Sequence, residues 1–456
     1  MDIAGKKFVI VGLGKTGAAL ARFLLPRGAA VTISEIKNEE DLGRKARVWK
    51  ERGVILETGQ HRLATFLASD FIVPSPGAAS LPLLQAAEEK GIQVISEIEL
   101  AYHFIRGRVV GITGTNGKST TASLAHKILK EAGLKAYLAG NIGTPLISFV
   151  EGSRDDHIYV TEVSSFQLEH IRRFRVGISV FLNVSLNHLD WHDSFAAYFG
   201  AKKRLVLAQG QGDVAILNRD DRLVWALSGE TDARVYSFSG RAKVRRGCFL
   251  RDGWIILRDE NGEQPLMKAE EVPLPGGHNR ENVMAAALVG HCLGAAPKSM
   301  RASIRSFAGL EHRLEKVLTL RGVGFVNDSK ATTVDASVKA IQSFDQPIVL
   351  ILGGRDKGAD FRLLRQPVKQ KVKKVILLGE AREKIWQALR GAAVMGSAAT
   401  LREAVAQAFV AARRGEIVLL APACTSFDMF KNFAARGRAF KREVRGLRDL
   451  VRGARK

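Results

Sequence analysis

The sequence predicts an α/β protein of three domains, each built on a parallel or mainly parallel sheet. Three observations support this fold class. Short apolar runs alternate with segments rich in Ala and Leu along the chain, which is typical of βαβ units. Most of the apolar runs end in a glycine or a polar residue, as strands do at the ligand-binding edge of an open sheet. The length of 456 residues exceeds what one ordinary core accommodates.

The first domain, residues 1–104, is predicted to be Rossmann-like. Residues 7–14 form a buried strand that runs into a glycine turn, a helix over 16–26 follows, and a strand over 30–34 completes a βαβ unit. The turn holds three glycines at the spacing of a dinucleotide-binding loop, Gly12, Gly14 and Gly17. Such a turn presents the bare amides of a helix N-terminus to a phosphate. A tight turn without a ligand fits the motif equally well.

The second domain, residues 105–308, is predicted to be P-loop ATPase-like, with a mainly parallel sheet. A strand enters a glycine loop over 114–121 that contains Gly-Lys-Ser, and an Ala- and Leu-rich helix follows. Glycines let backbone amides approach phosphates, Lys118 can meet the β and γ oxygens, and the Ser119 hydroxyl can bind magnesium. Because Ile112 stands where the strict motif has its first glycine, a chance loop is the alternative.

Two further strands of the second domain lead to candidate metal ligands. The strand over 158–161 ends at Glu162, and the strand over 176–182 leads into a segment that contains His188. Magnesium must bridge the phosphates to an acidic group, so Glu162 is a candidate ligand, with an ordinary surface glutamate as an equal alternative. His188 could bind a second cation, although a loop histidine more often serves only as a hydrogen-bonding group.

The third domain, residues 309–456, is predicted to be another Rossmann-like α/β sheet. Its strands are expected over 325–326, 348–352, 375–378 and 417–420. Most of them run into glycine or polar loops, and such loops gather at one edge of a parallel sheet. Residues 431–456 are strongly basic and are predicted to form an amphipathic closing helix with a solvated basic face.

The charge of the chain allows several interpretations. Lys and Arg total 69 against 46 acidic residues, a formal net charge of +23. A nucleic-acid or membrane-surface partner, an enzyme that handles several phosphates, and a simply basic surface all fit this excess. Because basic residues are spread along the chain and are not interleaved with aromatic residues, we place the basic surface first and nucleic acid third. We expect no specific nucleic-acid partner.

The composition favours a cytoplasmic protein. No apolar run is long enough to span a bilayer, and the apolar run near the N-terminus is too short for a signal peptide. Three cysteines lie far apart without metal or disulfide spacing, which fits a reducing compartment. We therefore expect a cytoplasmic location without membrane insertion, and a monomer.

Several motifs together resemble the Mur ligases of bacterial peptidoglycan synthesis. They are residues 114–121, Glu162–Leu168, Gly277-His278-Asn279, Glu311-His312-Arg313, 327–332 and 353–357. The stretch 422–433, with Arg436-Gly437, resembles the members that add D-glutamate. The resemblance covers all three domains in order.

The resemblance implies an ATP-dependent ligase that activates a carboxylate as an acyl phosphate and joins it to an amino acid. It implies UDP-N-acetylmuramoyl-L-alanine, D-glutamate and ATP as substrates. The first domain would hold the UDP part, the second would bind ATP, and the third would close and present D-glutamate. A sister ligase that adds another amino acid is one alternative, and a nucleotide-dependent nucleic-acid-binding protein, suggested only by the charge, is another.

The resemblance also assigns roles to single residues. The implied catalytic residues are Lys118, Glu162, His188 and Lys202. Two magnesium ions would be held by Ser119, Glu162, His188 and Lys202. ATP would be bound by Gly114, Thr115, Asn116, Gly117, Lys118, Ser119, Thr120, Asn279, Asn282, His312, Arg313, Asp328 and Lys330. The UDP-substrate would be bound by Lys15, Thr16, Glu35, Ser75, Gly77 and Asn141. The amino acid would be bound by Thr332, Lys357, Ser426 and Phe433.

The family carries a lysine that reacts with CO2 to form a carbamate, and alignment on Tyr198 points to Lys202 as that residue. Helical phase agrees, because Tyr198, Lys202 and Leu205 share one face, although the adjacent Lys203 is the alternative. Two residues depart from the family pattern. Asn187 precedes the metal-binding histidine where Asp is usual, which removes a charge from the second metal site, and Glu35 stands where Asp is common.

Overall fold

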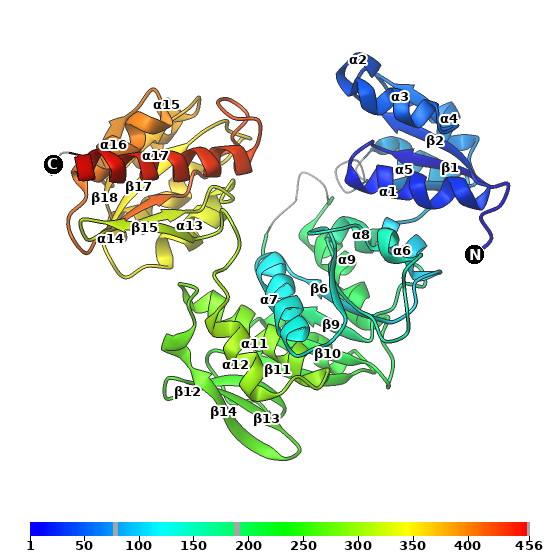
Figure 1. The fold of residues 1–456 in the computed structure, drawn as a ribbon, viewed down its shortest axis with the longest axis horizontal. Coiled ribbons are helices and arrows are strands. Elements are labelled where there is room, and N and C mark those ends of the chain that lie inside the picture. The colour runs from blue at the N-terminus through cyan, green and yellow to red at the C-terminus, as the bar shows by residue number, and fades with distance from the viewer. Residues whose placement is uncertain (76–80, 187–191, 454–456) are drawn as a thin grey trace. The chain divides into compact units, whose positions relative to one another are not determined.

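The computed structural model describes residues 1–75, 81–186 and 192–453. It divides into two compact units (Figure 1), one of residues 1–271 with 280–305, and one of residues 272–279 with the chain from 306 onward. The first unit contains two sheets and the second contains one. Among the described residues, no helix has the length and apolar character needed to cross a membrane.

The first sheet of unit 1 has five parallel strands in the order β3-β2-β1-β4-β5. This is the order expected of a Rossmann-like sheet, with the crossover beside β1. The strands are β1 (Lys7–Val11), β2 (Ala30–Glu35), β3 (Ile55–Thr58), β4 (Phe71–Pro74) and β5 (Gln93–Val94). The helices are α1 (Lys15–Leu24), α2 (Glu39–Leu42), α3 (Arg44–Lys50), α4 (Leu63–Leu67), α5 (Pro82–Glu89) and α6 (Glu97–Tyr102).

The second sheet of unit 1 has nine strands in the order β14-β13-β12-β11-β10-β9-β6-β8-β7. Seven are parallel, and the antiparallel hairpins β12–β13 and β13–β14 extend one edge. The strands are β6 (Arg108–Thr113), β7 (Ala136–Gly140), β8 (Ile158–Glu162), β9 (Ile178–Phe181), β10 (Val214–Asn218), β11 (Arg234–Ser239), β12 (Gly247–Arg251), β13 (Trp254–Asp259) and β14 (Gly262–Lys268). The helices are α7 (Lys118–Glu131), α8 (Ser165–Glu169), α9 (Phe195–Leu207), α10 (Arg222–Ala226), α11 (Gly277–Cys292) and α12 (Pro297–Arg305), with the 3₁₀ turn η2 (Leu146–Phe149).

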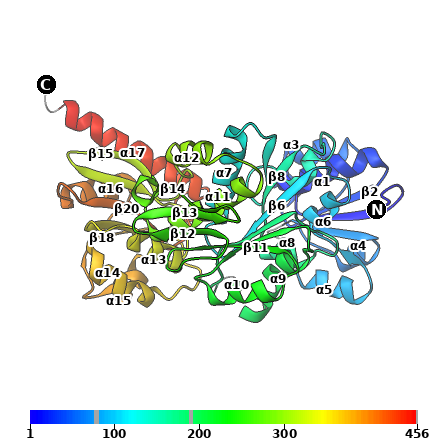
Figure 2. The same ribbon diagram turned by 90° about the horizontal axis from the view of Figure 1, so that it is seen from below.

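Unit 2 holds a six-stranded sheet in the order β15-β16-β20-β17-β18-β19, parallel except for β15. The strands are β15 (Glu315–Leu320), β16 (Val323–Asn327), β17 (Ile348–Gly353), β18 (Val372–Leu378), β19 (Val394–Ser397) and β20 (Ile417–Leu420). The helices are α13 (Val334–Gln342), α14 (Arg365–Lys371), α15 (Arg382–Leu389), α16 (Leu401–Ala411) and α17 (Phe433–Gly453). The C-terminal helix α17 packs beside α16 (Figures 1 and 2), where Phe440 and Val444 join the core.

The structure confirms the predicted α/β class and its mainly parallel sheets. One helix begins earlier than the sequence indicates, because α7 begins at Lys118, inside the glycine loop. A turn at Arg321 joins β15 to β16 as an antiparallel hairpin. Strand β15 was not predicted, because its side chains are mostly half-exposed and do not form an apolar run.

Candidate active site

The glycine loop forms a phosphate-binding turn between β6 and α7. Gly117 caps α7 with a φ of +85° and offers no side chain to the amides of the first helical turn. A Cβ at Gly117 would lie 2.2 Å from Oδ1 of Asn282, so both the backbone angle and the contact require glycine. Nζ of Lys118 donates to the carbonyl oxygens of Gly114 and Thr115, at 2.7 and 3.0 Å. The loop therefore presents backbone amides and an ammonium group at a helix N-terminus, which is an anion site.

Residues that follow β9 hold the phosphate loop in shape. The amide of Asn116 donates to Oδ1 of Asn183 at 2.9 Å, and Nδ2 of Asn183 donates back to the Asn116 carbonyl at 3.2 Å. The hydroxyl of Thr115 accepts from the amide of Ser185 at 3.0 Å and contacts the Tyr198 hydroxyl at 3.0 Å. The phosphate loop after β6 is thus held by hydrogen bonds to the residues that follow the neighbouring strand β9.

Glu162 ends β8 next to the loop strand, because β8 pairs with β6. Its side chain is only 3% exposed. Oε1 accepts from Nδ2 of Asn141 at 2.9 Å, whereas Oε2 is buried and has no hydrogen-bond partner among the residues that the structure describes. A buried carboxylate oxygen without a partner is costly, and a bound cation would satisfy it. Asn141, assigned to the UDP-substrate, therefore touches a candidate metal ligand.

Lys202 lies on α9 and is 1% exposed. Its Nζ donates to the Gly114 carbonyl at 3.1 Å and to Oγ1 of Thr113 at 3.4 Å, and it lies 4.8 Å from the centre of the Tyr198 ring. Burial, and next the charge of Lys118, hold the pKa of Lys202 well below its usual range. The neutral amine, which is the form that can react with CO2, is therefore favoured.

The donor set fits magnesium. Ser119 is buried at the start of α7, Glu162 offers an unsatisfied oxygen, and a carbamate on Lys202 would add another carboxylate-like group. Oxygen ligands of this kind suit magnesium. Among the described residues no group of three or more His, Cys, Asp and Glu side chains is gathered to hold a metal, so this site depends on the hydroxyl and the modified lysine. His188 lies outside the described residues.

The glycine turn of the first sheet is braced by Glu35. Its Oε2 accepts from the Leu13 amide at 2.7 Å, and Oε1 accepts from the Lys37 amide at 3.2 Å. Ser75 follows β4, and its hydroxyl lies 3.4 Å from the Gly12 carbonyl. Glu35, Ser75 and the Lys15–Thr16 start of α1 thus share the carboxyl edge of neighbouring strands. Gly77 lies outside the described residues.

In unit 2, three loops meet at the carboxyl edge of neighbouring strands β16, β20 and β17. The Ala423 amide donates to the Ala331 carbonyl at 2.9 Å, and Arg355 and Thr425 exchange two backbone hydrogen bonds of 3.0 Å. These loops carry Thr332, Ser426 and Lys357. Phe433 begins α17, and its carbonyl accepts from the Ser329 hydroxyl at 2.8 Å. The four residues assigned to the amino acid thus come from one sheet edge and the adjoining helix start.

The residues of unit 2 assigned to ATP lie on the same edge. His312 is buried with a φ of +66°, and its Nδ1 accepts from Nδ2 of Asn327 at 2.9 Å. Its Nε2 is buried, and no described residue forms a hydrogen bond with it. Burial raises the pKa of Asp328 to about 7, while the nearby charge of Arg313 opposes the rise. Lys330 lies 4.3 Å from the centre of the Phe433 ring.

The predicted ATP residues are divided between the two units. Those of the phosphate loop and Asn282 belong to unit 1, and Asn282 accepts from the Thr121 hydroxyl at 3.3 Å. Asn279 and the residues from His312 to Lys330 belong to unit 2. The roles of all these residues stay predictions.

Two structural roles were missed from the sequence. Ser164 caps α8, and Gln167 reciprocates as a capping box, which accounts for part of the Glu162–Leu168 motif; the Ser-x-x-Gln spacing could have revealed it. Arg436 is 2% exposed and donates to Oγ and the carbonyl oxygen of Ser329 and to the carbonyls of Cys424 and Thr425. A basic residue in a basic segment gives no sequence signal of burial.

Solved structures share the fold at low sequence identity. A pseudomurein peptide ligase type C from Methanothermus fervidus aligns with a TM-score of 0.60 at 19% identity, covering 97% of this chain and 100% of that one. A UDP-N-acetylmuramate-alanine ligase from Thermotoga maritima aligns with a TM-score of 0.59 at 16% identity, covering 97% and 99%.

Closer relatives match in sequence along nearly the whole length. A UDP-N-acetylmuramoylalanine–D-glutamate ligase of Acidobacterium capsulatum is 45% identical over 444 residues, covering 97% of this chain and 96% of the relative. The ligase of the same name from Koribacter versatilis is 44% identical over 450 residues, covering 98% and 99%.

Fold and site together define a nucleotide-binding α/β protein with a phosphate-binding loop and ligand-binding sheet edges. Three family models match the chain in order, and they are the N-terminal domain of MurD-like Mur ligases over 6–96, the Mur ligase middle domain over 112–290 and the Mur ligase, glutamate ligase domain over 312–424. The chain belongs to the Mur ligase family.

Proposed function

We propose that this protein adds D-glutamate to UDP-N-acetylmuramoyl-L-alanine, with cleavage of ATP to ADP and phosphate, in cytoplasmic synthesis of a peptidoglycan precursor. The observation that carries the proposal is the 44–45% identity, over nearly the whole length, to ligases of that name. The stretch 422–433 supports the same amino acid. Residues 1–104, 105–308 and 309–456 would serve the UDP-substrate, ATP and D-glutamate in turn.

The reaction proceeds in two steps. The substrate carboxylate attacks the γ-phosphate of ATP, the bond to the β-phosphate oxygen breaks, and an acyl phosphate and ADP form. The amine of D-glutamate then attacks the acyl carbon, loses a proton, and phosphate leaves. The Lys118 ammonium group and the amides of the first turn of α7 stabilise charge on the phosphates.

Magnesium would be held by Ser119, Glu162 and the carbamate of Lys202, with His188 as a ligand of a second ion. When bound it would neutralise phosphate charge. Support comes from the unsatisfied oxygen of Glu162 and from the lowered pKa of Lys202. In unit 2, Thr332, Lys357, Ser426 and Phe433 would form the D-glutamate pocket.

An assay of ADP release with UDP-N-acetylmuramoyl-L-alanine and one amino acid at a time tests the substrate. We expect product with D-glutamate only. Equal product with L-glutamate or with a diamino acid would contradict the assignment and favour a sister ligase.

The substitution Lys118→Ala tests whether the ATP site and the UDP-substrate site are separate. We expect it to nearly abolish turnover, because a positive charge facing the β and γ phosphates is lost. Binding of the UDP-substrate, measured by calorimetry, should stay within about twofold, since that ligand is assigned to the first sheet edge. An equal loss of UDP-substrate binding would show that the two sites are not separate.

A further inference from the structure

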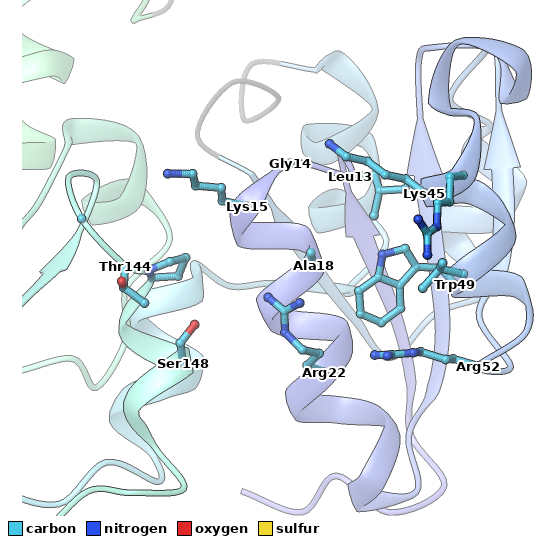
Figure 3. Close-up of a pocket in the computed structure, with 14 residues that line it drawn as sticks. Leu13, Gly14, Lys15, Ala18, Arg22, Lys45, Trp49, Arg52, Thr144 and Ser148 are labelled. Atoms are coloured by element: carbon cyan, nitrogen blue, oxygen red, sulfur yellow. The ribbon is translucent and has the colours of Figure 1, made fainter.

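A cavity opens along the outer side of α1 in unit 1 (Figure 3), and among the described residues its lining shares only Lys15 with those assigned to the proposed reaction. Its volume is about 640 Å³, within the range of small-molecule sites. It lies between α1, α3 and the segment 143–148, which includes the start of η2. Its lining contains no residue of the phosphate loop, and none of Thr16, Glu35, Ser75 and Asn141.

The lining is strongly basic. It contains Lys15, Arg22, Arg44, Lys45 and Arg52, and no acidic side chain of the described part of the chain. All five are exposed, and among the described residues none of them forms an ion pair with a carboxylate. Elsewhere in this unit exposed cations commonly do so, as Lys50 on α3 does with Glu39 at 2.6 Å. Unpaired charges of one sign around a concave space repel one another and attract an anion.

Helical spacing directs these cations into one space. Lys15 and Arg22 lie seven residues apart on α1, which is about two turns along one face. Ala18 lies between them on that face and lines the same cavity. Arg44 begins α3, and Arg52 follows its end by two residues. In Figure 3 Lys15 and Arg22 extend to the side on which Thr144 and Ser148 lie, and Lys45 and Arg52 flank Trp49.

The remaining lining is suited to a compact anion. Trp49 is buried and closes one wall, with the guanidinium of Arg52 5.3 Å from its ring centre. The exposed hydroxyls of Thr144 and Ser148 face the space from the other side. At one end, α1 begins at Lys15 with Gly14 as its N-cap and no side-chain cap, so its first amides are open to an anion.

We propose that this cavity is a binding site for a small anion with two or more phosphate groups. Guanidinium groups recognise phosphate through paired N–H donors. Because several cations lie in a row along two helices, they match a ligand with several phosphates better than they match a ligand with a single carboxylate. The site adjoins the assigned UDP-substrate residues through Lys15 but is otherwise separate from them. The inference does not depend on the identity of the ligated amino acid.

The test is calorimetric titration of the full chain with inorganic tripolyphosphate, without magnesium. Every sample carries Lys118→Ala, so that the phosphate loop lacks its ammonium group. We expect one saturable site, weakened at least about tenfold by Arg22→Glu and by Arg52→Glu, since each replaces a phosphate donor by a repelling charge. Arg47→Glu is the matched control, because Arg47 is an exposed residue of α3 that does not line the cavity. It should weaken binding by less than about twofold after screening by salt.

Four outcomes would overturn the proposal. The first is that tripolyphosphate shows no saturable binding, and the second is that Arg47→Glu weakens its binding as much as Arg22→Glu and Arg52→Glu do. The third is that Asn141→Ala weakens its binding tenfold. The fourth is that a mixed-sequence single-stranded oligonucleotide binds more tightly than tripolyphosphate and that all three charge reversals weaken this binding equally. The second and fourth would indicate a generally basic surface, and the third would place the ion at the UDP-substrate position. Urea unfolding of each variant checks that exposed substitutions leave the fold intact.

Discussion

Lys202 occupies a position where an ordinary lysine is poorly accommodated. It is enclosed by Tyr198, the Gly114 carbonyl and the charge of Lys118, and no carboxylate of the described residues forms a hydrogen bond with it. The neighbouring Lys203 is half-buried and lies 3.7 Å from Glu230. One residue along the helix thus changes the environment from enclosed to partly solvated, which favours Lys202 over Lys203 as the carbamylated residue.

We expect Lys202→Ala to reduce turnover by at least about a hundredfold, because the carboxylate-like group of the carbamate is lost from the magnesium site. Added short-chain carboxylic acids such as acetate or propionate should restore part of the activity by filling the vacated space. Turnover with and without the acid is the measurement.

Lys203→Ala is the matched control and should stay within about threefold of the unmodified chain, since its ion pair is at the surface. Full activity of Lys202→Ala, or rescue by acid at Lys203 alone, would show that the modified residue has been misassigned.

At the scale of an element, the start of α17 holds the loops of the unit 2 sheet edge together. Arg436 reaches from this helix to Ser329 and to Cys424 and Thr425, which follow two neighbouring strands. The next residue must be glycine, because a Cβ at Gly437 would lie 2.2 Å from Nδ1 of His312. The Arg436-Gly437 pair therefore joins helix, loops and His312.

Arg436→Ala should lower the free energy of unfolding of unit 2 by roughly 3–5 kcal/mol, because it leaves buried carbonyls without donors. Urea unfolding measures this change. Arg438→Ala, an exposed change on the same helix, should stay within about 0.5 kcal/mol. If both variants lose the same stability, the buried hydrogen bonds are not the cause.

Helix α6 connects the two sheets of unit 1 through buried carboxylates. Glu99 is 1% exposed and accepts from the amides of Arg172, Arg173 and Phe174. Glu97 is 3% exposed and accepts from the amide of Ile147 at 2.7 Å. Burial raises the pKa of Glu97 from 4.5 to about 7, against the lowering effect of its backbone hydrogen bonds.

This pKa predicts how stability depends on pH. Between about 4.5 and 7 the folded chain binds a proton at Glu97 that the unfolded chain has lost, so stability falls as pH rises through this window. The difference corresponds to roughly 3 kcal/mol at about 1.36 kcal/mol per pKa unit. We expect Glu97→Gln to flatten the decline in the urea unfolding midpoint across this window.

Glu89→Gln is the control for the pH experiment, because Glu89 is an exposed carboxyl on α5. Its midpoints should follow those of the unmodified chain at each pH. An unchanged slope in Glu97→Gln would show that another group dominates the pH dependence.

At the scale of the whole molecule, the cores explain why three sheets form two compact units. One cluster of buried apolar residues continues from the first sheet to the second, and it includes Phe23 of α1, Ile147 of η2 and Tyr159 of β8. The two large clusters of unit 2 contain only residues from 314 onward. The proposed boundary near residue 104 is therefore a boundary between sheets that share a core, and it stays a prediction as a domain limit.

We expect residues 306–456, expressed alone, to fold with a cooperative urea transition, because both clusters of their core are complete within them. Far-ultraviolet circular dichroism and urea unfolding are the measurements. Residues 1–104 expressed alone should be less stable, because part of their apolar surface is buried against the second sheet. A non-cooperative transition for 306–456 would mean that its stability depends on the rest of the chain.

Much of the fold and part of the site could be predicted from the sequence because they depend on local patterns. Apolar runs that end in glycine identified most strands, and Gly117-Lys118-Ser119 identified the phosphate loop, since a glycine turn before a helix specifies its own geometry. Helical phase placed Lys202 on the buried face beside Tyr198, as the structure confirms. Motifs of this kind need no knowledge of what packs against them.

Contacts between distant segments decided the rest. The unsatisfied oxygen of Glu162, the burial of Arg436 and the shared core of the first two sheets each depend on residues far apart in the chain. The basic cavity arises because α1, α3 and the segment 143–148 pack around one space. Apart from Lys15, which the resemblance assigned to the UDP-substrate, its cations read in the sequence as ordinary surface residues, since periodicity indicates which face of a helix is polar but not which other segment that face meets.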